Sequence, residues 1–389
     1  VMQWGNYNGQ PPYTITLLQG IKEKAPNAKV IYYPLCGLTD ATVYESLWNS
    51  CLANGNIGFS ATYWNNSDLS GDVAATVQAS SPITFFTMGA TTPAPGVNIE
   101  KFSSSYKTSF APGHSGKAVF RISHNGKLVI KINGKTVLEK ERVANPEDIY
   151  ELNFVKGEKY DIELTFVSVR RDSYMTFDLL EKSSDISVAM KDLRKADAII
   201  FAGGISPKLE GEEMRVSAKG FKGGDREDIE LPDAQRDVIK RLSTLGKRLI
   251  FVNFSGSAIA MEPETKVCGA ILQAWYPGQE GGRALADVIF GDVNPSGRLP
   301  MTFYRNVAQL PDFLDYSMKG RTYRYMTEKP LFAFGHGLSY TTFAYKSATF
   351  EKESICYGDS AVLRVELSNI GKRAGEEVIQ VYVSRPSDT

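Results

Sequence analysis

The hydrophobic pattern of this 389-residue chain changes its period twice, and this limits the folds available to it. Residues 118–123, 127–132 and 160–166 alternate apolar and polar side chains, as half-buried β-strands do. Later in the chain, apolar strands alternate with amphipathic helices, with strands expected at 198–201 and 248–253 around a helix at 232–245. This second pattern is typical of a parallel sheet covered by helices. The sequence therefore predicts an α/β fold with an open, mostly parallel sheet (an α/β sandwich) interrupted by an all-β insertion.

The predicted domain boundaries follow these changes in pattern. The α/β domain is discontinuous and comprises residues 1–57 and 186–300, with the β insertion at 58–185. Residues 301–345 are predicted to be a linker packed on the α/β domain, and 346–389 the start of an immunoglobulin-like β-sandwich, which is too short for a whole domain. Further helices are predicted at 14–23, 39–54 and 282–290, and further strands at 28–33, 269–275, 362–367 and 377–383. Asn125-Gly126 and Asn133-Gly134 are predicted hairpin turns.

Composition excludes several functional classes. The chain has 44 Lys and Arg and 44 Asp and Glu, so no basic excess suggests a nucleic-acid partner. Its apolar runs are shorter than the roughly 20 residues of a membrane helix. The four cysteines and three histidines show no metal or redox spacing, so zinc and redox motifs are not expected. Buried free thiols are the favoured interpretation of the cysteines, while pairing of Cys36 with Cys51 stays open.

An acidic loop follows the strand predicted at 198–201 and carries Glu210, Glu212 and Glu213. In open α/β sheets, ligands bind beyond the carboxyl ends of the strands. Crowded carboxylates repel one another, so that one of them retains its proton at higher pH, as a general acid requires. The alternative interpretation is a solvated acidic surface loop.

A second loop at a strand end contains Trp275, Tyr276 and several glycines. Its aromatic rings can wall a sugar site, because aromatic faces suit sugar rings. The alternative is a strand-to-helix turn in which glycines supply unusual backbone angles.

In their order along the chain, these segments resemble glycoside hydrolase family 3, in its β-glucosidase and β-xylosidase branch. The matching segments are Trp4–Gly9, the Glu210 loop with Gly224-Asp225-Arg226 and Leu231-Pro232, Trp275–Gly282, Gly297–Pro300 and Arg321–Thr341. The insertion, with Tyr63-Trp64-Asn65 and Leu128–Gly134, is similar to the protective-antigen-type β domain of this branch. The last residues are similar to its fibronectin type III-like domain. The resemblance covers essentially the whole chain.

The resemblance implies a retaining exo-acting β-glycosidase, a β-xylosidase or β-glucosidase, that releases terminal sugars from an oligosaccharide or glycoside. It implies no metal or organic cofactor. In this family the nucleophile is an Asp on an N-terminal (β/α) barrel, which this chain does not contain. The acid/base is a Glu of the second domain, with Glu210 favoured over Glu212 and Glu213 a third candidate. About ten residues separate these glutamates from the Gly-Asp-Arg element, which usually follows directly.

The resemblance also implies supporting residues and a setting for the site. Asp225 and Arg226 are expected to order the acidic loop at the substrate site. Tyr63, Trp64 and Phe102 of the insertion can wall the leaving-group subsite, although core packing is the alternative for each.

Neither terminus has the features of a natural end, so an internal piece of a longer protein is expected, nearly inactive alone. The substrate class favours a periplasmic or secreted protein. Two alternatives stay open: a non-catalytic carbohydrate-binding fragment and a purely structural one.

Overall fold

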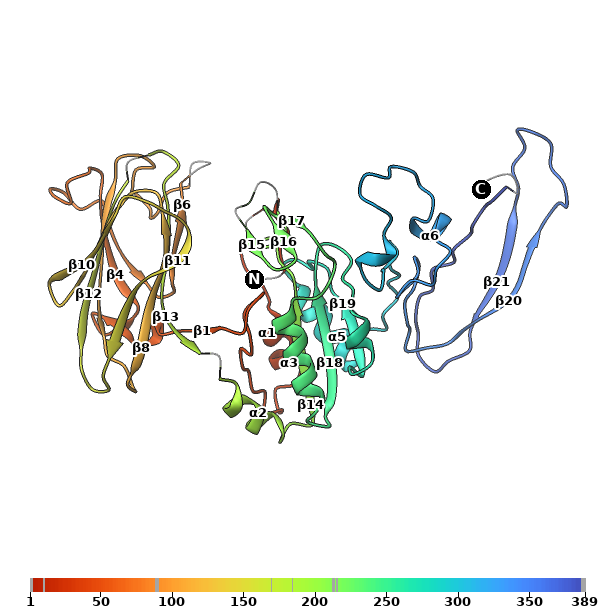
Figure 1. Ribbon diagram of the computed structural model, residues 1–389, viewed down its shortest axis with the longest axis horizontal. Helices are drawn as coiled ribbons and strands as arrows, with labels where there is room; N and C mark the ends of the chain where they lie inside the picture. The colour runs from red at the N-terminus through yellow and green to blue at the C-terminus, as the bar shows by residue number, and fades with distance from the viewer. Residues whose placement is uncertain are drawn as a thin grey trace. The chain divides into compact units, whose positions relative to one another are not determined.

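The computed structural model describes residues 3–9, 11–87, 91–168, 170–183, 185–211, 214 and 216–385, and the chain divides into two compact units. The β unit comprises Thr42–Asp185, and the α/β unit comprises Val1–Ala41 and Ile186–Thr389 (Figure 1). Among the described residues, no helix is long and apolar enough to cross a membrane.

The β unit is built from two antiparallel sheets around one hydrophobic core. One sheet has five strands in the order β1-β13-β8-β11, with β6 also on β13. The other has eight, in the order β10-β9-β12-β7-β2-β3, with β4 on β7 and β5 on β4. The elements are β1 (Val43–Ser46), η1 (Trp48–Ser50), β2 (Cys51–Ala53), β3 (Asn56–Ile57), β4 (Phe59–Trp64), β5 (Ala75–Ala79), β6 (Ile83–Phe86), β7 (Ser103–Phe110), β8 (Gly116–His124), β9 (Lys127–Ile132), β10 (Lys135–Lys140), β11 (Val143–Phe154), β12 (Tyr160–Val167) and β13 (Tyr174–Ser183). The strands predicted at 118–123, 127–132 and 160–166 are confirmed.

Of the two predicted hairpin turns, the structure confirms one. Asn133 (φ 49°) and Gly134 (φ 76°) join β9 to its neighbour β10 with left-handed backbone at both central positions. The prediction at Asn125-Gly126 is wrong, because β8 and β9 belong to different sheets. The Asn125 side chain accepts from the Tyr174 amide (2.9 Å) and donates to the Asp172 carbonyl (2.8 Å), so it holds a crossing between sheets.

The helix predicted at 39–54 is also wrong. This segment forms β1, the short 3-10 helix η1 and β2, and it belongs to the β unit. Val43 pairs with Ser183 on β13, and the Trp48 ring stacks on Phe59 with centroids 4.6 Å apart. The apolar spacing that suggests a helix is satisfied here by pairing and packing against the rest of the β unit.

His124 at the end of β8 is a buried titratable side chain of the β unit. Its side chain is fully buried, Nδ1–H donates to the Gly126 carbonyl (2.7 Å), and Nε2 has no partner among the described residues. Burial lowers the pKa of His124, partly opposed by that bond and by Glu141. The unfolded state therefore binds a proton first as the pH falls through about 6.5.

We expect the free energy of unfolding of the β unit to fall as the pH is lowered below about 6.5. His124→Gln should flatten this dependence, measured by urea unfolding between pH 5 and 7.5. Asp178, whose pKa burial raises to about 6, titrates in both proteins, so their difference isolates His124. Parallel pH profiles for the two proteins would contradict this assignment.

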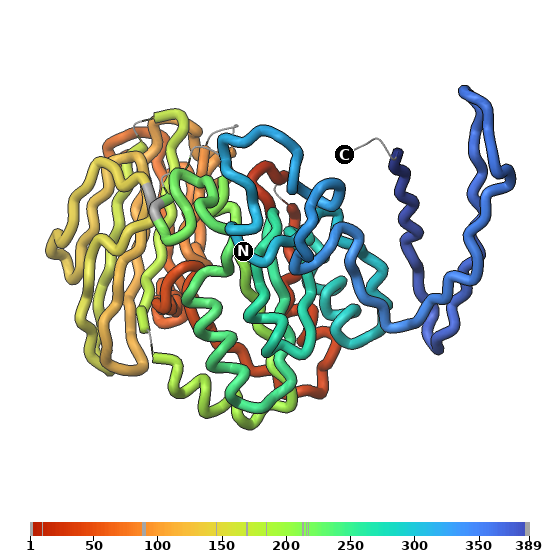
Figure 2. Tube along the Cα trace, turned by 45° about the vertical axis from the view of Figure 1, so that its right-hand side comes forward, coloured from red at the N-terminus to blue at the C-terminus, as the bar shows by residue number. Residues whose placement is uncertain are grey.

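The α/β unit has a central parallel sheet in the order β14-β18-β19 with helices on both faces (Figures 1 and 2). Ile199, Phe201 and Phe251 pack with α3 residues on one face. On the other face, Val252 and Phe254 pack with residues of α1 and α5. The elements are α1 (Leu17–Lys24), α2 (Ser187–Leu193), β14 (Ala198–Gly204), β15 (Ser217–Ala218), β16 (Phe221–Lys222), β17 (Asp225–Arg226), α3 (Asp233–Ser243), β18 (Arg248–Phe254), α4 (Glu262–Thr265), β19 (Ala270–Gln273), α5 (Gly281–Phe290), η2 (Val307–Gln309), α6 (Thr322–Tyr325), β20 (Phe343–Phe350) and β21 (Leu363–Asn369).

Most predicted elements of the α/β unit are confirmed. The helices predicted at 14–23, 232–245 and 282–290 are α1, α3 and α5, and the strands predicted at 198–201, 248–253 and 269–275 are β14, β18 and β19. The strand predicted at 28–33 is wrong: the segment pairs with no strand among the described residues, and Ile31 and Tyr32 are exposed. Four free cysteines lie in the chain, of which Cys51 is buried and Cys356 is exposed.

The C-terminal segment contains one antiparallel pair of strands, β20 and β21. The prediction at 362–367 is confirmed by β21. Residues 377–383 form no strand, although the Glu377 carboxylate pairs with Arg298 (2.8 Å). The apolar and polar residues alternate there, but the segment does not pair with another strand of the described structure. The prediction of a third strand is therefore wrong.

Candidate functional site

Three loops meet at the carboxyl edge of the parallel sheet. Gly204 at the end of β14 lies opposite Phe254 of β18, and Asn253 of β18 lies opposite Gln273 of β19. The loops that leave these strands carry Glu210, Ser257 and Tyr276. This edge is where open α/β sheets bind their ligands.

Gly204 starts the Glu210 loop and has a backbone that only glycine adopts readily, with φ +122°. The buried Gln235 side chain of α3 accepts from the Gly204 amide (2.6 Å) and donates to its carbonyl (2.7 Å). The next amide, of Ile205, donates to the Phe254 carbonyl (2.8 Å). These bonds fix the direction in which the acidic loop leaves the sheet.

The Glu210 carboxylate is held by donors from the other two loops. Oε1 accepts from the Gly256 amide (3.2 Å) and more weakly from the Tyr276 hydroxyl (3.4 Å), and Oε2 accepts from the Ser257 hydroxyl (2.9 Å). The Asn6 amide group donates to the Glu210 carbonyl (3.3 Å). Glu210 thereby ties its loop to the ends of β18 and β19.

Arg226 joins this group from β17. Its Nη1 donates to the Ser257 hydroxyl and to the Ala258 carbonyl (both 3.0 Å), and Nε donates to the Asp228 carbonyl (3.0 Å). Nη2 is buried without a partner among the described residues. Burial lowers the pKa of Arg226, and the charge of Glu210 opposes this. Ser257 thus links Arg226 to Glu210, while Asp225 is exposed on the same strand.

The two aromatic residues after β19 have different surroundings. Burial raises the pKa of Tyr276, and the Glu210 carboxylate adds to the rise, so Tyr276 keeps its proton to donate. Trp275 has a left-handed backbone (φ +54°) and packs edge-to-face on Phe303, with centroids 6.1 Å apart. Trp275 is half-buried in the hydrophobic core.

A buried amide network beneath the loops was missed by sequence reasoning. Asn253 donates to the Gln273 side-chain oxygen (2.7 Å) and to the Ser255 hydroxyl (3.2 Å), and Gln273 also donates to Ser255 (3.0 Å). The Asn253 Oδ1 atom is buried and unpartnered among the described residues. The available signal was an amide side chain at the end of each of two apolar strands.

The remaining predicted residues lie elsewhere. Tyr63 is in the core of the β unit, 4% exposed, with its hydroxyl 3.0 Å from that of Tyr106. Phe102 is fully buried in the same core. These rings cannot serve as a substrate wall, which corrects that expectation in favour of core packing. Trp64 ends β4 and is half-buried, so its role stays a prediction. Glu212 and Glu213 fall outside the described residues.

Within the described ranges, no group of three or more His, Cys, Asp or Glu side chains is placed to hold a metal ion. The titratable groups of the site are Glu210, Arg226 and Tyr276. Their hydrogen bonds join the three loops into one polar cluster.

A three-layer α/β domain with a carboxylate loop at the carboxyl edge of its sheet belongs to the class of open-sheet α/β domains, in which ligands commonly bind at this edge. The family model described as the glycosyl hydrolase family 3 C-terminal domain matches residues 1–340. The chain therefore belongs to glycoside hydrolase family 3, through its C-terminal domain.

Two similar proteins have names that fit this family. The chain is 44% identical over 393 residues to a xylan 1,4-beta-xylosidase of Xylanibacter ruminicola, covering 100% of the chain and 45% of that protein. It is 37% identical over 210 residues to a periplasmic beta-glucosidase of Salmonella typhimurium, covering 51% of the chain and 26% of that protein. The chain thus spans less than half the length of these relatives.

Among solved structures, a beta-glucosidase from Kluyveromyces marxianus in complex with glucose superposes with a TM-score of 0.70. The match covers 99% of this chain and 49% of that chain at 20% identity. At this identity, the match shows a likeness of fold alone.

Proposed function

We propose that this chain is the C-terminal part of a retaining, exo-acting β-glycosidase that hydrolyses terminal β-linked xylose or glucose. The observation that carries the proposal is the 44% identity, along its whole length, to a protein named as a xylan 1,4-beta-xylosidase. The acidic loop at the carboxyl edge of the sheet is consistent with it. The nucleophilic carboxylate would come from an N-terminal (β/α) barrel of the same protein.

The proposal gives two glutamates of the acidic loop different roles, one in positioning and one in acid/base catalysis. Both oxygens of Glu210 already accept hydrogen bonds, from Gly256, Ser257 and Tyr276. A general acid must carry a proton toward the leaving oxygen, and a proton on Glu210 would compete with these donors. We therefore assign Glu210 a positioning role and give Glu212 the acid/base role, which reverses the preference between the two candidates.

The supporting roles of the other predicted residues follow from their places. Arg226 positions the loop through Ser257, and Asp225 lies beside it on an exposed strand, where it can reach substrate. Trp275 would present its ring edge at the rim of the site. Trp64 of the β unit is kept as a substrate contact, with the β unit as a protective-antigen-type domain and β20 and β21 as the start of a fibronectin type III-like domain.

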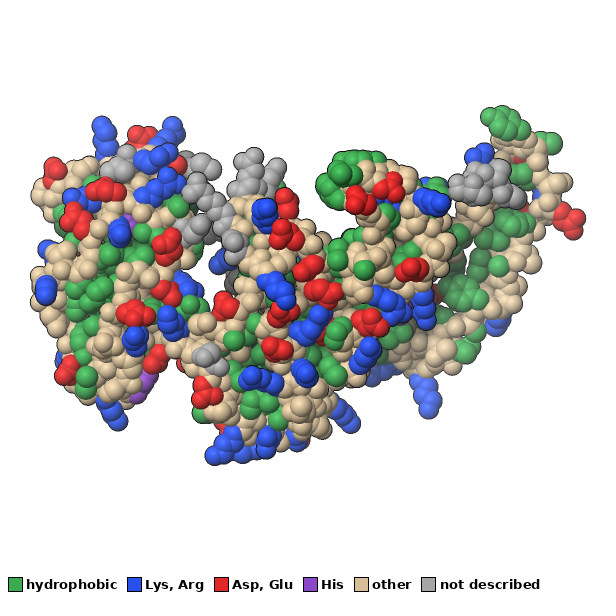
Figure 3. Space-filling model, in the orientation of Figure 1, with side chains coloured by type: hydrophobic (Ala, Val, Ile, Leu, Met, Phe, Trp, Pro, Cys, Tyr) green, Lys and Arg blue, Asp and Glu red, His purple; other side chains and the backbone are tan. Residues whose placement is uncertain are grey.

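An exposed apolar loop of the α/β unit is the surface that we expect to contact a neighbouring domain. Phe313, Leu314 and Tyr316 are 87%, 78% and 86% exposed, and hydrophobic side chains gather on the surface near α6 in Figure 3. Clustered exposed apolar side chains mark interaction surfaces. We assign this loop to the contact with the barrel. As its relative in Salmonella is named periplasmic, we place the protein in the periplasm or outside the cell.

The test compares the 389-residue chain with the longer protein on p-nitrophenyl β-xyloside and β-glucoside. We expect the longer protein to hydrolyse at least one of them with retained anomeric configuration, followed by NMR of the first product. The chain alone should be inactive, because it lacks the nucleophile. Hydrolysis by the chain alone, or inversion by the longer protein, would refute the proposal.

The alternative is a carbohydrate-binding fragment without chemistry, which the polar side chains of Ser60, Lys107 and Glu163 on one face of the β unit favour. In that case the longer protein would bind xylo- or cello-oligosaccharides but leave both aryl glycosides intact.

A further inference from the structure

The outer face of the eight-stranded sheet carries a row of polar side chains in direct lateral register. Lys131 of β9 lies opposite Glu163 of β12, Glu163 opposite Lys107 of β7, and Lys107 opposite Ser60 of β4. The next row toward β2 holds Asp161, which faces Ser109. Alternate residues of these strands point into the core, so this face is free of core packing.

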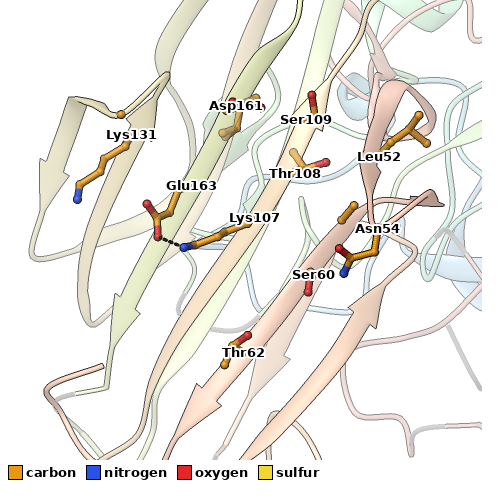
Figure 4. A pocket seen from close by; sticks show the side chains of 13 residues that line it. Leu52, Asn54, Ser60, Thr62, Lys107, Thr108, Ser109, Lys131, Asp161 and Glu163 are labelled. Atoms are coloured by element: carbon orange, nitrogen blue, oxygen red, sulfur yellow. Dashed lines mark ion pairs between the residues drawn. The ribbon is translucent and has the colours of Figure 1, made fainter. Parts of the chain in front are cut away.

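These side chains line a shallow pocket on the sheet (Figure 4). It is lined by Leu52, Asn54, Ser60, Thr62, Lys107, Ser109, Lys131, Asp161 and Glu163, with parts of their neighbours. Short side chains of β7 and β4, such as Ser109, Ser60 and Thr62, form its floor, and β12 with Glu163 separates Lys131 from Lys107. The floor residues are half-buried although they are polar, as expected for a hollowed surface.

The hydrogen-bonding capacity of this face is largely unused. Glu163 Oε1 pairs with Lys107 Nζ (3.1 Å) and accepts from Ser105 (3.1 Å). Within the described part of the chain, the side chains of Ser60, Thr62, Ser109 and Lys131 have no hydrogen-bond or ion-pair partner. The pocket therefore offers several free hydroxyls together with ionic donors and acceptors.

The charge balance selects the chemistry of a ligand. The pocket contains two lysines and two carboxylates, so its formal charge is zero, and its lining is mostly polar, with Leu52, Ala53 and Ile162 as its larger apolar residues. A nucleic acid or a polyanion would find no net attraction there, and an apolar ligand would find no apolar floor. A neutral, polyhydroxylated molecule matches it, since hydroxyls both donate and accept.

We propose that this face of the β unit binds a neutral β-linked oligosaccharide, laid across strands β9, β12, β7 and β4. Adjacent strands lie about 4.8 Å apart, so the four span about 15 Å, long enough for several sugar rings of an extended chain. Glu163 accepts from the sugar hydroxyls, Lys131 donates to them, and Ser60 and Ser109 complete the contacts. The site lies within the β unit and does not require the proposed hydrolysis.

The test is calorimetric titration of the 389-residue chain with xylohexaose and cellohexaose. At least one should bind, and Glu163→Gln should weaken its binding about tenfold, because hydrogen bonds to a charged group are lost. Ser60→Lys, which fills the floor, should abolish binding. Glu151→Gln is the matched control: it removes the carboxylate paired with Lys117 (2.8 Å) on the other sheet and should leave binding unchanged.

The possible results separate this site from the proposed active site. Glu212→Gln should bind like the original chain if the β unit holds the sugar. Loss of binding in Glu212→Gln, but not in Glu163→Gln and Ser60→Lys, would overturn the proposal while leaving the glycosidase assignment intact. Absence of heat with both hexaoses, or equal weakening by Glu151→Gln, would also overturn it. Tighter binding of oligogalacturonate would contradict the neutral ligand.

Discussion

Replacement of Glu212 by Gln in the longer protein should slow hydrolysis of unactivated disaccharides on the order of a thousandfold. An amide cannot protonate the leaving oxygen, so glycosides with poor leaving groups depend on the lost proton most. Aryl glycosides with good leaving groups should form the glycosyl-enzyme nearly as before and then accumulate it. Azide should restore their turnover as a glycosyl azide, because a small anionic nucleophile needs no general base. The measurement is kcat and kcat/KM across a series of leaving groups, with and without azide.

Glu210→Gln is the matched control for this experiment. It keeps the size of the side chain, and its amide nitrogen would face the Gly256 amide or the Ser257 hydroxyl, both of which are donors to Glu210. The loop should therefore shift, and activity should fall similarly for good and poor leaving groups, without azide rescue. Ser257→Ala should resemble Glu210→Gln in a milder form. Azide rescue of Glu210→Gln, but not of Glu212→Gln, would return the acid/base role to Glu210.

The sequence predicts well those elements whose ends have their own chemistry. The helix α3 begins after Pro232 and ends before Gly246 (φ +66°), and α5 ends at Gly291 (φ +80°). The segment at 39–54 shows that such residues do not suffice, because it has Asp40 near its start and Gly55 after its end and yet forms no α-helix. Its apolar spacing is compatible with a helix, and only pairing with β13, distant in sequence, makes part of it a strand. The same holds for Asn125-Gly126, whose dipeptide is typical of a hairpin but which connects two sheets.

The candidate site was predicted in part, for a similar reason. An acidic loop after a strand is visible in the sequence, and Glu210 and Arg226 do lie in one cluster. Ser257 was missed because a serine in a loop has no distinguishing pattern, and its role depends on the parallel register that places β18 beside β14. Tyr63 is of a residue type that suits a sugar contact, yet its hydroxyl is hydrogen-bonded to the Tyr106 hydroxyl inside the core.

Gly204→Ala should be the most destabilising small substitution at this site. Its backbone has φ +122°, where residues with a Cβ are strained, and a Cβ there would overlap with the Phe254 carbonyl oxygen and crowd the Asn253 Oδ1. Strain and overpacking together should lower the free energy of unfolding of the α/β unit by about 3 kcal/mol. A displacement of Gly204 would disturb the pairing of β14 with β18 and the two hydrogen bonds of Gly204 with Gln235. The Gln235 side chain and the Glu210 loop should then become less ordered.

Gly246→Ala separates backbone strain from crowding. Gly246 also has a left-handed backbone (φ +66°), but no atom lies within 4 Å of the place that a Cβ would take, so only about 1 kcal/mol should be lost. Urea unfolding, monitored by hydrogen exchange with mass spectrometry, measures the free energy of unfolding of each unit separately. The value for the β unit should be unchanged in both variants. Equal losses in the two variants would mean that the crowding at Gly204 is relieved by movement of β18. In that case the acidic loop would not be held rigidly by the sheet, and the positioning role of Glu210 would lose its structural basis.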